Sequence, residues 1–213
     1  MLLSDIHFAA LLAYSPHGVD AKSRESQTWA YRLKDEAAVG ASRRPASEFF
    51  VDRLAFHVGN GLLANHFGPD VIVVPMPGHA LWNPDGLWVP DRLCTKLVER
   101  GLAARKARWL ERVVPVDKSR AGVRVSAEQH ADSMNAVVDV QDPASVLIVD
   151  DVITRGSVGL AAVSLLKKLL PRSDVRLFAM IRTISDPTEF RQFLDPCTGT
   201  VALQRDGSTV RHP

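Results

Sequence analysis

The sequence predicts an α/β fold with a parallel sheet that helices cover on both faces. Three short apolar runs rich in β-branched residues, at 70–77, 145–151 and 174–183, have the composition of strands buried on both faces. The segment 157–170, between the last two runs, has helical periodicity. Strands that alternate with helices are typical of a parallel sheet, and ligands bind such sheets at the carboxyl ends of their strands. The loops that follow the first two runs are therefore the first candidates for a site.

The first half of the chain is expected to form helices and one strand. Residues 3–14 are apolar enough for a short helix or strand. Residues 47–67 place apolar side chains on one broad helical face, although Gly59 and Gly61 weaken its centre. At 70–77, prolines close a buried strand. The other expected elements are a helical piece at 26–37, a loop at 78–89, and a helix from Pro90 to about Arg100 that Gly101 ends.

The second half alternates strands and helices more regularly. The helix expected at 157–170 has its leucines and valines on the core side, and Pro171 ends it. Asp206-Gly207 lies between two β-prone runs and predicts a hairpin at 200–210. The remaining expected elements are strands at 107–116, 145–151 and 174–183, an exposed loop at 117–126, one or two helical turns at 126–134, and a helix at 185–194.

Composition indicates a soluble globular protein. The chain has 213 residues, 46% of them hydrophobic and 23% charged, which suits one domain with appendages. The net charge of +2 gives no global field that attracts nucleic acid or membrane. Cys94 and Cys197 lie far apart without metal-ligand spacing, so we expect a reduced, cytoplasmic protein. No apolar run approaches the ~18 residues that span a bilayer, and the N-terminus lacks signal-peptide features.

The most informative stretch is VLIVDDVITRGSVG at 146–159. Its apolar strand runs into two adjacent carboxylates, Asp150 and Asp151. A small, hydroxyl-bearing loop follows and leads into a helix, whose free N–H groups attract anions. The loop hydroxyls add hydrogen-bond donors, and Gly156 permits a close approach of the backbone. We therefore expect this loop to bind a phosphate.

The two carboxylates would repel that phosphate unless another group separates the charges. A sugar does so, because carboxylates accept hydrogen bonds from vicinal hydroxyls while the phosphate lies one loop further along. The residues themselves therefore suit a ribose 5-phosphate. Two other interpretations stay open. Receiver domains that accept a phosphoryl group also have acidic pairs at strand ends, although theirs lie near the first strand, and the loop could simply be solvated.

The same stretch resembles the phosphoribosyl pyrophosphate (PRPP) signature of type I phosphoribosyltransferases, which is a hydrophobic strand, two acidic residues and V-x-T-x-G. The resemblance implies that Asp150 and Asp151 are catalytic and bind the ribose 2′- and 3′-hydroxyls. Arg155 replaces a common Thr of the signature, and Val158 stands where many members have Thr. The residues implied to contact the 5′-phosphate are Val152, Ile153, Thr154, Arg155, Gly156 and Ser157.

Two further segments resemble the same family, so that the similarity spans 70–183. The run VIVVPMPGH resembles its strand and pyrophosphate loop, especially in the competence-associated ComF-like group. The residues implied to approach the pyrophosphate are Pro75, Met76, Pro77, Gly78 and His79. The family's flexible catalytic loop corresponds to VDKSRAGVRVSAEQH at 116–130. Its cations are Lys118, Arg120 and Arg124, and we expect Lys118 and Arg124 to be catalytic.

The resemblance implies a Rossmann-like type I phosphoribosyltransferase fold, with a parallel sheet of about five strands, flanking helices and a small variable hood. Residues 1–45 would form the hood or an appendage, 46–183 the phosphoribosyltransferase core, and 184–213 a C-terminal helix and hairpin. The implied reaction transfers the 5-phosphoribosyl group from PRPP to an unidentified nucleobase or related acceptor and releases pyrophosphate. Mg²⁺ would bind mainly through PRPP, with Asp150 and Asp151 as candidate protein ligands, and the family suggests a homodimer.

Other interpretations stay open. A non-catalytic member would keep the PRPP pocket as a PRPP- or nucleotide-sensing regulator, or as an accessory protein of DNA uptake or defence. From Arg100 to Arg124 there are eight Lys and Arg against two acids, and this +6 excess would also suit nucleic acid, which we do not favour. His79 alone would more often be structural, and His130 is expected in a core or surface role. The tryptophans expected to pack rather than to stack on bases are Trp82, Trp88 and Trp109.

Overall fold

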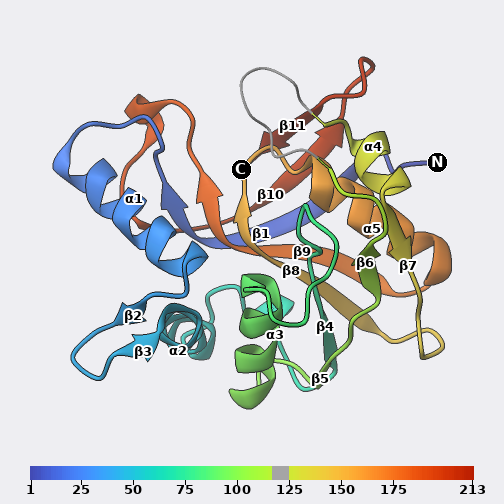
Figure 1. Ribbon diagram of the computed structural model, residues 1–213, viewed down its shortest axis with the longest axis horizontal. Coiled ribbons are helices and arrows are strands. Elements are labelled where there is room, and N and C mark those ends of the chain that lie inside the picture. Colours follow the sequence, from blue (N-terminus) through green and yellow to red (C-terminus); the bar gives the residue numbers. More distant parts are fainter. Residues whose placement is uncertain (117–124) are drawn as a thin grey trace.

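The computed structural model describes residues 1–116 and 125–213 (Figure 1). The strands are β1 (Asp5–Tyr14), β2 (Ala38–Val39), β3 (Arg44–Pro45), β4 (Val71–Pro75), β5 (Arg105–Lys106), β6 (Leu110–Arg112), β7 (Met134–Ala136), β8 (Ser145–Ile153), β9 (Asp174–Thr183), β10 (Leu194–Leu203) and β11 (Thr209–His212). The helices are α1 (Ala21–Lys34), α2 (Ala46–Gly59), α3 (Val89–Glu99), α4 (Ala127–Asp132) and α5 (Ser157–Leu169), with 3₁₀ turns at Ala64–His66 and Pro187–Glu189.

A mostly parallel sheet forms the centre of the molecule. Within the described residues it has seven strands in the order β11-β10-β1-β9-β8-β4-β5. Strands β5, β4, β8, β9 and β1 run parallel to one another, and the β10–β11 hairpin continues the sheet antiparallel at one edge. Helices lie on both sides of this sheet (Figure 1). The prediction of an α/β fold with a parallel sheet flanked by helices is confirmed.

Alternate residues of the buried strands enter two different cores, which explains why these strands are apolar throughout. In β8, Val146 and Ile148 lie in one core, whereas Leu147 and Val149 lie in the other. Helix α5 contributes to the first core together with β6 and β7. Helices α1, α2 and α3 contribute to the second. Strands buried on both faces have no polar face, so the sequence runs lack alternation.

The N-terminal strand β1 lies inside the sheet, between β9 and β10. Phe8 pairs with Leu177 of β9 on one side and with Gly199 of β10 on the other. The strand from Phe8 to Ala13 is almost completely buried. Of the segment 1–45 that the sequence assigns to a hood, residues 5–14 therefore belong to the sheet, and the boundaries at 45 and 183 stay predictions.

The middle of the chain has shorter elements than the sequence predicts. The helix expected at 47–67 ends at Gly59, because Gly61 adopts a φ of +87° and Leu63 is left-handed. The strand expected at 107–116 is reduced to β6, which pairs with β7 in a small separate sheet. Its predecessor β5 pairs with β4 at the edge of the central sheet instead.

The helix that the sequence predicts at 185–194 is absent, and a strand begins only at its last residue. Within 185–194, the structure has a 3₁₀ turn at Pro187–Glu189, and Leu194 already begins β10. Asp186 accepts a hydrogen bond from the backbone N–H of Thr188 and so caps only this short turn. From Leu194 onward the chain pairs with β1. The β10–β11 hairpin extends the sheet beyond the roughly five strands expected.

Candidate functional site

A cleft of about 750 Å³ lies where β4 and β8 reach their carboxyl ends. Two of the segments that the sequence predicts to be functional meet in it: the acidic pair of β8 and the loop after β4. Its polar and small lining residues are Lys34, Gly78, His79, Asn83, Gly86, Arg108, Glu111, Arg112, Asp150 and Asp151. Its apolar lining residues are Met76, Pro77, Ala80, Leu81, Trp82, Leu87, Trp88, Val89, Pro90 and Leu110.

The acidic pair sits where β8 extends beyond its neighbour. Strand β4 ends at Pro75, which pairs with Val149, so Asp150 is the first residue of β8 without a partner on that side. The sequence places the pair at the end of the strand, but β8 continues to Ile153 because these residues still pair with β9. The missing β4 neighbour opens the space that the two carboxylates line.

Asp150 is an unusual carboxyl group because it is only 9% exposed. The backbone N–H of Asp151 donates to its Oδ1 at 2.9 Å. Burial raises the pKa of Asp150 well above its ordinary value, and the negative charge of Asp151 raises it further, while Lys34 acts in the opposite direction. A buried carboxyl beside a second one is a good acceptor for a ligand hydroxyl, which satisfies it without adding charge.

Four hydrogen bonds fix the loop after β4. The N–H of Met76 donates to the carbonyl of Val149 at 2.8 Å, and the indole N–H of Trp88 donates to the carbonyl of Met76 at 2.8 Å. Arg112 donates to the carbonyl of Gly78 at 2.9 Å, and the N–H of Val116 donates to the carbonyl of His79 at 2.9 Å. The predicted pyrophosphate loop is therefore a well-supported wall of the cleft. Of its five predicted residues, all but Pro75 line the cleft.

The loop continues into an aromatic wall. Leu81, Trp82 and Leu87 are each about half exposed and line the cleft. The guanidinium of Arg108 lies over the rings of Trp82 and Trp88, at 5.5 and 5.4 Å from their centroids. Trp88 also has the structural hydrogen bond to the loop, as expected for a packing residue. Exposed apolar side chains in a cleft indicate a ligand with a flat or apolar part.

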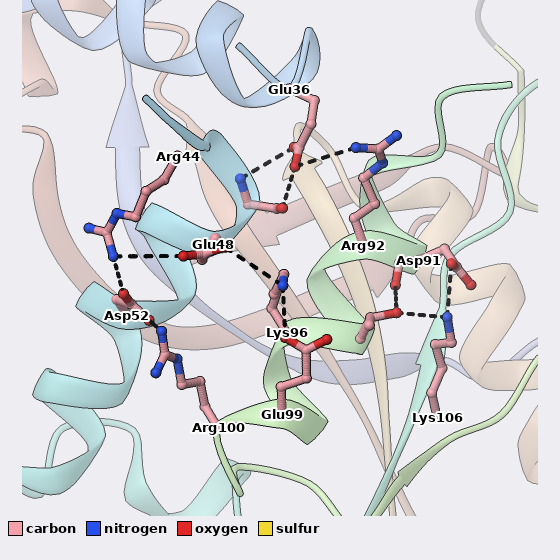
Figure 2. A network of polar contacts seen from close by, with 12 residues as sticks. Glu36, Arg44, Glu48, Asp52, Asp91, Arg92, Lys96, Glu99, Arg100 and Lys106 are labelled. Carbon is pink, nitrogen blue, oxygen red and sulfur yellow. Dashed lines mark hydrogen bonds and ion pairs between the residues drawn. The ribbon is translucent and has the colours of Figure 1, made fainter. Parts of the chain in front are cut away.

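A polar network behind this wall joins α3 to β5 and α2 (Figure 2). Asp91, in the first turn of α3, accepts a hydrogen bond from Lys106 of β5 at 2.8 Å. Asp91 also pairs with Arg108 at 3.1 Å. On the other side of α3, Lys96 lies 3.7 Å from Glu48 of α2. The network therefore positions both the start of α3 and the cation that stacks on the two tryptophans.

The predicted phosphate loop lies beside the cleft rather than in its wall. Thr154 and Arg155 are exposed, and the hydroxyls of Thr154 and Thr183 are 3.4 Å apart. Gly156 has a φ of +86°, and a Cβ there would lie 2.5 Å from a methyl group of Val201 in β10. Helix α5 begins at Ser157 without a side-chain cap, so its first N–H groups have no capping oxygen. None of the residues 152–157 lines the cleft.

The C-terminal hairpin contacts the loop after β8. The sequence did not predict this contact. Arg211 of β11 donates to the carbonyl of Ile153 at 3.2 Å and to that of Thr183. Burial lowers the pKa of Arg211 to about 10, and the positive charge of Arg182 adds to this effect. The loop is thus supported by a residue more than 50 positions away, and no local motif signals that contact.

In the described part of the basic stretch, four of the five cations form ion pairs. The ion pairs are Arg100 with Asp52, Arg105 with Asp139, and Lys106 and Arg108 with Asp91. Arg112, also in this stretch, is buried. Lys118 and Arg124, which the sequence predicts to be catalytic, lie outside the described residues, as does the third cation of that loop, Arg120.

The two histidines singled out by the sequence have different environments. His79 lines the cleft. Burial and the charge of Arg112 lower the pKa of His130 to about 4, so its ring is neutral at pH 7. Trp109 is buried, and its indole N–H donates to Asp139 at 2.7 Å. The predicted packing role therefore fits Trp109, and a core role fits His130.

The acidic pair could supply only some of the ligands of a metal ion. Across residues 1–116 and 125–213, no group of three or more His, Cys, Asp or Glu side chains is placed to bind a metal ion. Mg²⁺ commonly keeps several waters and uses one or two carboxylates together with substrate phosphates. Asp150 and Asp151 fit that kind of site and do not form a complete protein cage.

Within residues 1–116 and 125–213, no helix is both long and apolar enough to cross a membrane.

No family model matches the sequence, and no curated protein matches it either. Among solved structures, a hypoxanthine phosphoribosyltransferase from Staphylococcus aureus is similar over 65% of this chain and 75% of its own, with 12% identity and a TM-score of 0.37. The hypoxanthine phosphoribosyl transferase of Trypanosoma cruzi is similar over 76% of each chain, with 13% identity and a TM-score of 0.30. A glutamic acid mutant from a study of an invariant aspartic acid in HPRTs covers 85% of this chain and 93% of its own, with 12% identity and a TM-score of 0.32. At these values none of the three similarities supports a conclusion about function.

Proposed function

We propose that the protein is a type I phosphoribosyltransferase that binds PRPP with Mg²⁺ and transfers the 5-phosphoribosyl group to a nucleobase or related acceptor. One observation supports this above all. The acidic pair, with Asp150 buried and Asp151 partly exposed, and the loop Met76–His79 line the same cleft, although 70 residues separate them in the sequence. The cleft thus offers carboxylates for sugar hydroxyls beside a hydrogen-bonded loop and cations for phosphates.

The proposed reaction is a displacement at C1 of the ribose. A ring nitrogen of the acceptor forms a bond to C1, the C1–O bond to pyrophosphate breaks, and its electron pair leaves with the pyrophosphate. The acceptor nitrogen loses a proton to solvent or to a cleft group. Asp150 and Asp151 accept hydrogen bonds from the ribose 2′- and 3′-hydroxyls and so fix C1 in place. Positioning of this kind supplies much of a rate enhancement.

Charge stabilisation has two parts in this proposal. Mg²⁺, when bound, would neutralise negative charge on the pyrophosphate oxygens. The protein's own contribution is a partly buried carboxylate pair near the positive charge that develops on the ribose. The loop Thr154–Ser157, in which Thr154 and Arg155 are exposed, and the start of α5 supply donors for the 5′-phosphate. The aromatic wall with Trp82 suits a planar acceptor.

The activity test uses PRPP, Mg²⁺ and a panel of nucleobases. We expect base-dependent release of pyrophosphate, with the matching nucleotide detected by mass spectrometry. The double variant Asp150→Asn/Asp151→Asn should bind PRPP at least ~10-fold more weakly by calorimetry, because two charge-assisted hydrogen bonds become neutral ones. Exposed Asp70→Asn is the matched control and should bind normally. Unchanged PRPP binding in the double variant would refute the proposal.

Two parts of the proposal have separate tests. PRPP binding without turnover across the whole panel would instead support the non-catalytic regulator or accessory protein. The proposed homodimer is tested by sedimentation equilibrium.

A further inference from the structure

Arg112 of β6 differs from the other described cations of the basic stretch because it has no carboxylate partner among the described residues. The other four described cations of residues 100–112 each have a carboxylate partner. Arg112 has no ion pair with a carboxylate of the described residues, and at 5% exposure it is also strongly buried. It nevertheless lines the cleft. A buried cation beside a ligand cleft and without a counter-charge needs an explanation.

The contacts of Arg112 use only part of its guanidinium. Nε donates to the carbonyl of Gly78 at 2.9 Å, and Nη1 donates to the hydroxyl of Ser133 and, at 3.5 Å, to the carbonyl of His130. Nη2 donates no hydrogen bond to an oxygen of residues 1–116 or 125–213. Burial lowers the pKa of Arg112, and no neighbouring carboxylate counters that effect. Its three hydrogen-bond acceptors among the described residues are therefore all neutral.

A structural role explains some of these features. Arg112 joins the loop after β4, which lines the cleft, to the segment from α4 to β7, which does not line it. A neutral amide side chain could donate similar hydrogen bonds without the cost of burying a charge. The positive charge and the remaining donors are explained if an anion occupies the cleft next to Gly78.

We propose that Arg112 binds the pyrophosphate group of PRPP and holds the carbonyl of Gly78 in the position that this group requires. This inference rests on the proposed function and assigns the anion-binding role to a residue outside the motifs. The planar guanidinium suits phosphate oxygens, which it can bind through two parallel N–H groups. Asp150 and Asp151 line the same cleft and repel an anion. A ligand that presents hydroxyls to the two carboxylates and phosphates to Arg112 provides hydrogen-bond partners for both.

The experiment compares two ligands on the full-length protein by calorimetry: pyrophosphate with Mg²⁺, and ribose 5-phosphate. Arg112→Gln should weaken pyrophosphate binding by roughly 10–100-fold, the usual effect of losing charge-assisted hydrogen bonds, and leave ribose 5-phosphate affinity within about 2-fold. Arg105→Gln is the matched control, because it removes the same charge from an exposed pair with Asp139 outside the cleft. It should change neither affinity.

Two more variants separate binding from support of the fold. Ser133→Ala removes one anchor of Arg112 but keeps the charge, so pyrophosphate affinity should fall less than about 3-fold if the charge is what matters. Arg112→Lys keeps the charge but loses the planar fork, and an approximately 5-fold loss is expected. If Arg112→Gln does not fold, these two variants decide the question.

The outcomes distinguish the inference from the proposed function. Unchanged pyrophosphate affinity in Arg112→Gln or Arg112→Lys, with ribose 5-phosphate still bound, overturns the role of Arg112 alone. A larger loss in Ser133→Ala than in Arg112→Lys also overturns it, because support of the fold would then be the main role. A wild-type protein that binds neither ligand overturns the proposed function as well.

Discussion

The two loops at the carboxyl edge of the sheet are built in opposite ways. The loop after β4 lies in the cleft wall, and backbone and side-chain hydrogen bonds from β8, Trp88 and Arg112 hold it in place. The loop after β8 lies beside the cleft, with Thr154 and Arg155 exposed and Gly156 packed under β10. The first loop therefore depends on polar contacts around a cavity. The second depends on backbone conformation, on close packing at one glycine and on the hydrogen bond from Arg211 to the carbonyl of Ile153.

The two loops show that a specific sequence signature and extensive stabilising contacts need not occur in the same loop. The loop after β8 has the more specific sequence signature, whereas the loop after β4 has the more extensive contacts. A signature restricts which residues occupy a loop, but the hydrogen bonds that hold the loop come from segments far away in the sequence. The following changes test whether the two loops respond as differently as their contacts suggest, from the largest expected effect to the smallest.

Gly156→Ala should have the largest effect on stability. The new Cβ would meet Val201 at 2.5 Å, and the φ of +86° disfavours any side chain. Together these terms should lower the free energy of unfolding by about 2–4 kcal/mol. Urea unfolding measures the change. Gly40→Ala is the matched control, since its φ is +73° but no atom lies within 4 Å of the added Cβ. It should cost only the backbone term, about 1–2 kcal/mol.

Adding Val201→Ala to Gly156→Ala should restore part of the lost stability, because the smaller side chain makes room for the methyl group. Equal losses in Gly156→Ala and Gly40→Ala would mean that packing under β10 does not distinguish this loop.

Trp88→Phe tests the polar support of the loop after β4. The change removes the hydrogen bond to the Met76 carbonyl and weakens the stacking of Arg108, so we expect about 1–2 kcal/mol less stability. Trp82→Phe is the control: Trp82 also stacks with Arg108, but it is exposed. Its effect should stay within about 0.5 kcal/mol. Thermal and urea unfolding give both values, and similar losses in the two variants would contradict the role assigned to the Met76 hydrogen bond.

Asp150→Asn should stabilise the protein at neutral pH. The pKa of Asp150 is raised in the folded state, so between the ordinary carboxyl pKa and this higher value the folded protein binds more protons than the unfolded chain. Stability of the wild type therefore falls as pH rises through that window, and the neutral amide avoids the loss. Unfolding is measured from pH 4 to pH 8, with Asp70→Asn as the exposed control. A variant less stable than wild type at pH 7 would argue against a destabilising carboxyl pair.

If Asp150→Asn stabilises the protein but loses PRPP binding, the wild-type pair lowers stability in order to bind the ligand. Proteins often keep strained or repulsive groups where a ligand needs them.

The sequence predicts the parts of the site that local pattern determines. The buried runs that became β4, β8 and β9 are recognisable because two-sided burial makes them continuously apolar. The meeting of the acidic pair with the loop after β4 follows from the parallel order of β4 and β8. Lys34, Arg112 and Arg211 could not be identified, because their roles depend on contacts over long sequence distances. The position of β1 in the sheet was unpredictable for the same reason.

Thr154→Ala should have the smallest effect on stability and still inform on the loop after β8. Thr154 is exposed and its one recorded side-chain contact, with Thr183, is 3.4 Å long, so stability should change by no more than about 0.5 kcal/mol. If the loop binds the 5′-phosphate, the lost donor should weaken ribose 5-phosphate binding by roughly 5–10-fold, while pyrophosphate affinity is unchanged. Thr28→Ala, exposed on α1, is the control. Unchanged ribose 5-phosphate affinity would show that the Thr154 hydroxyl does not hold the phosphate, and the free N–H groups at the start of α5 would then have to hold it without that hydroxyl.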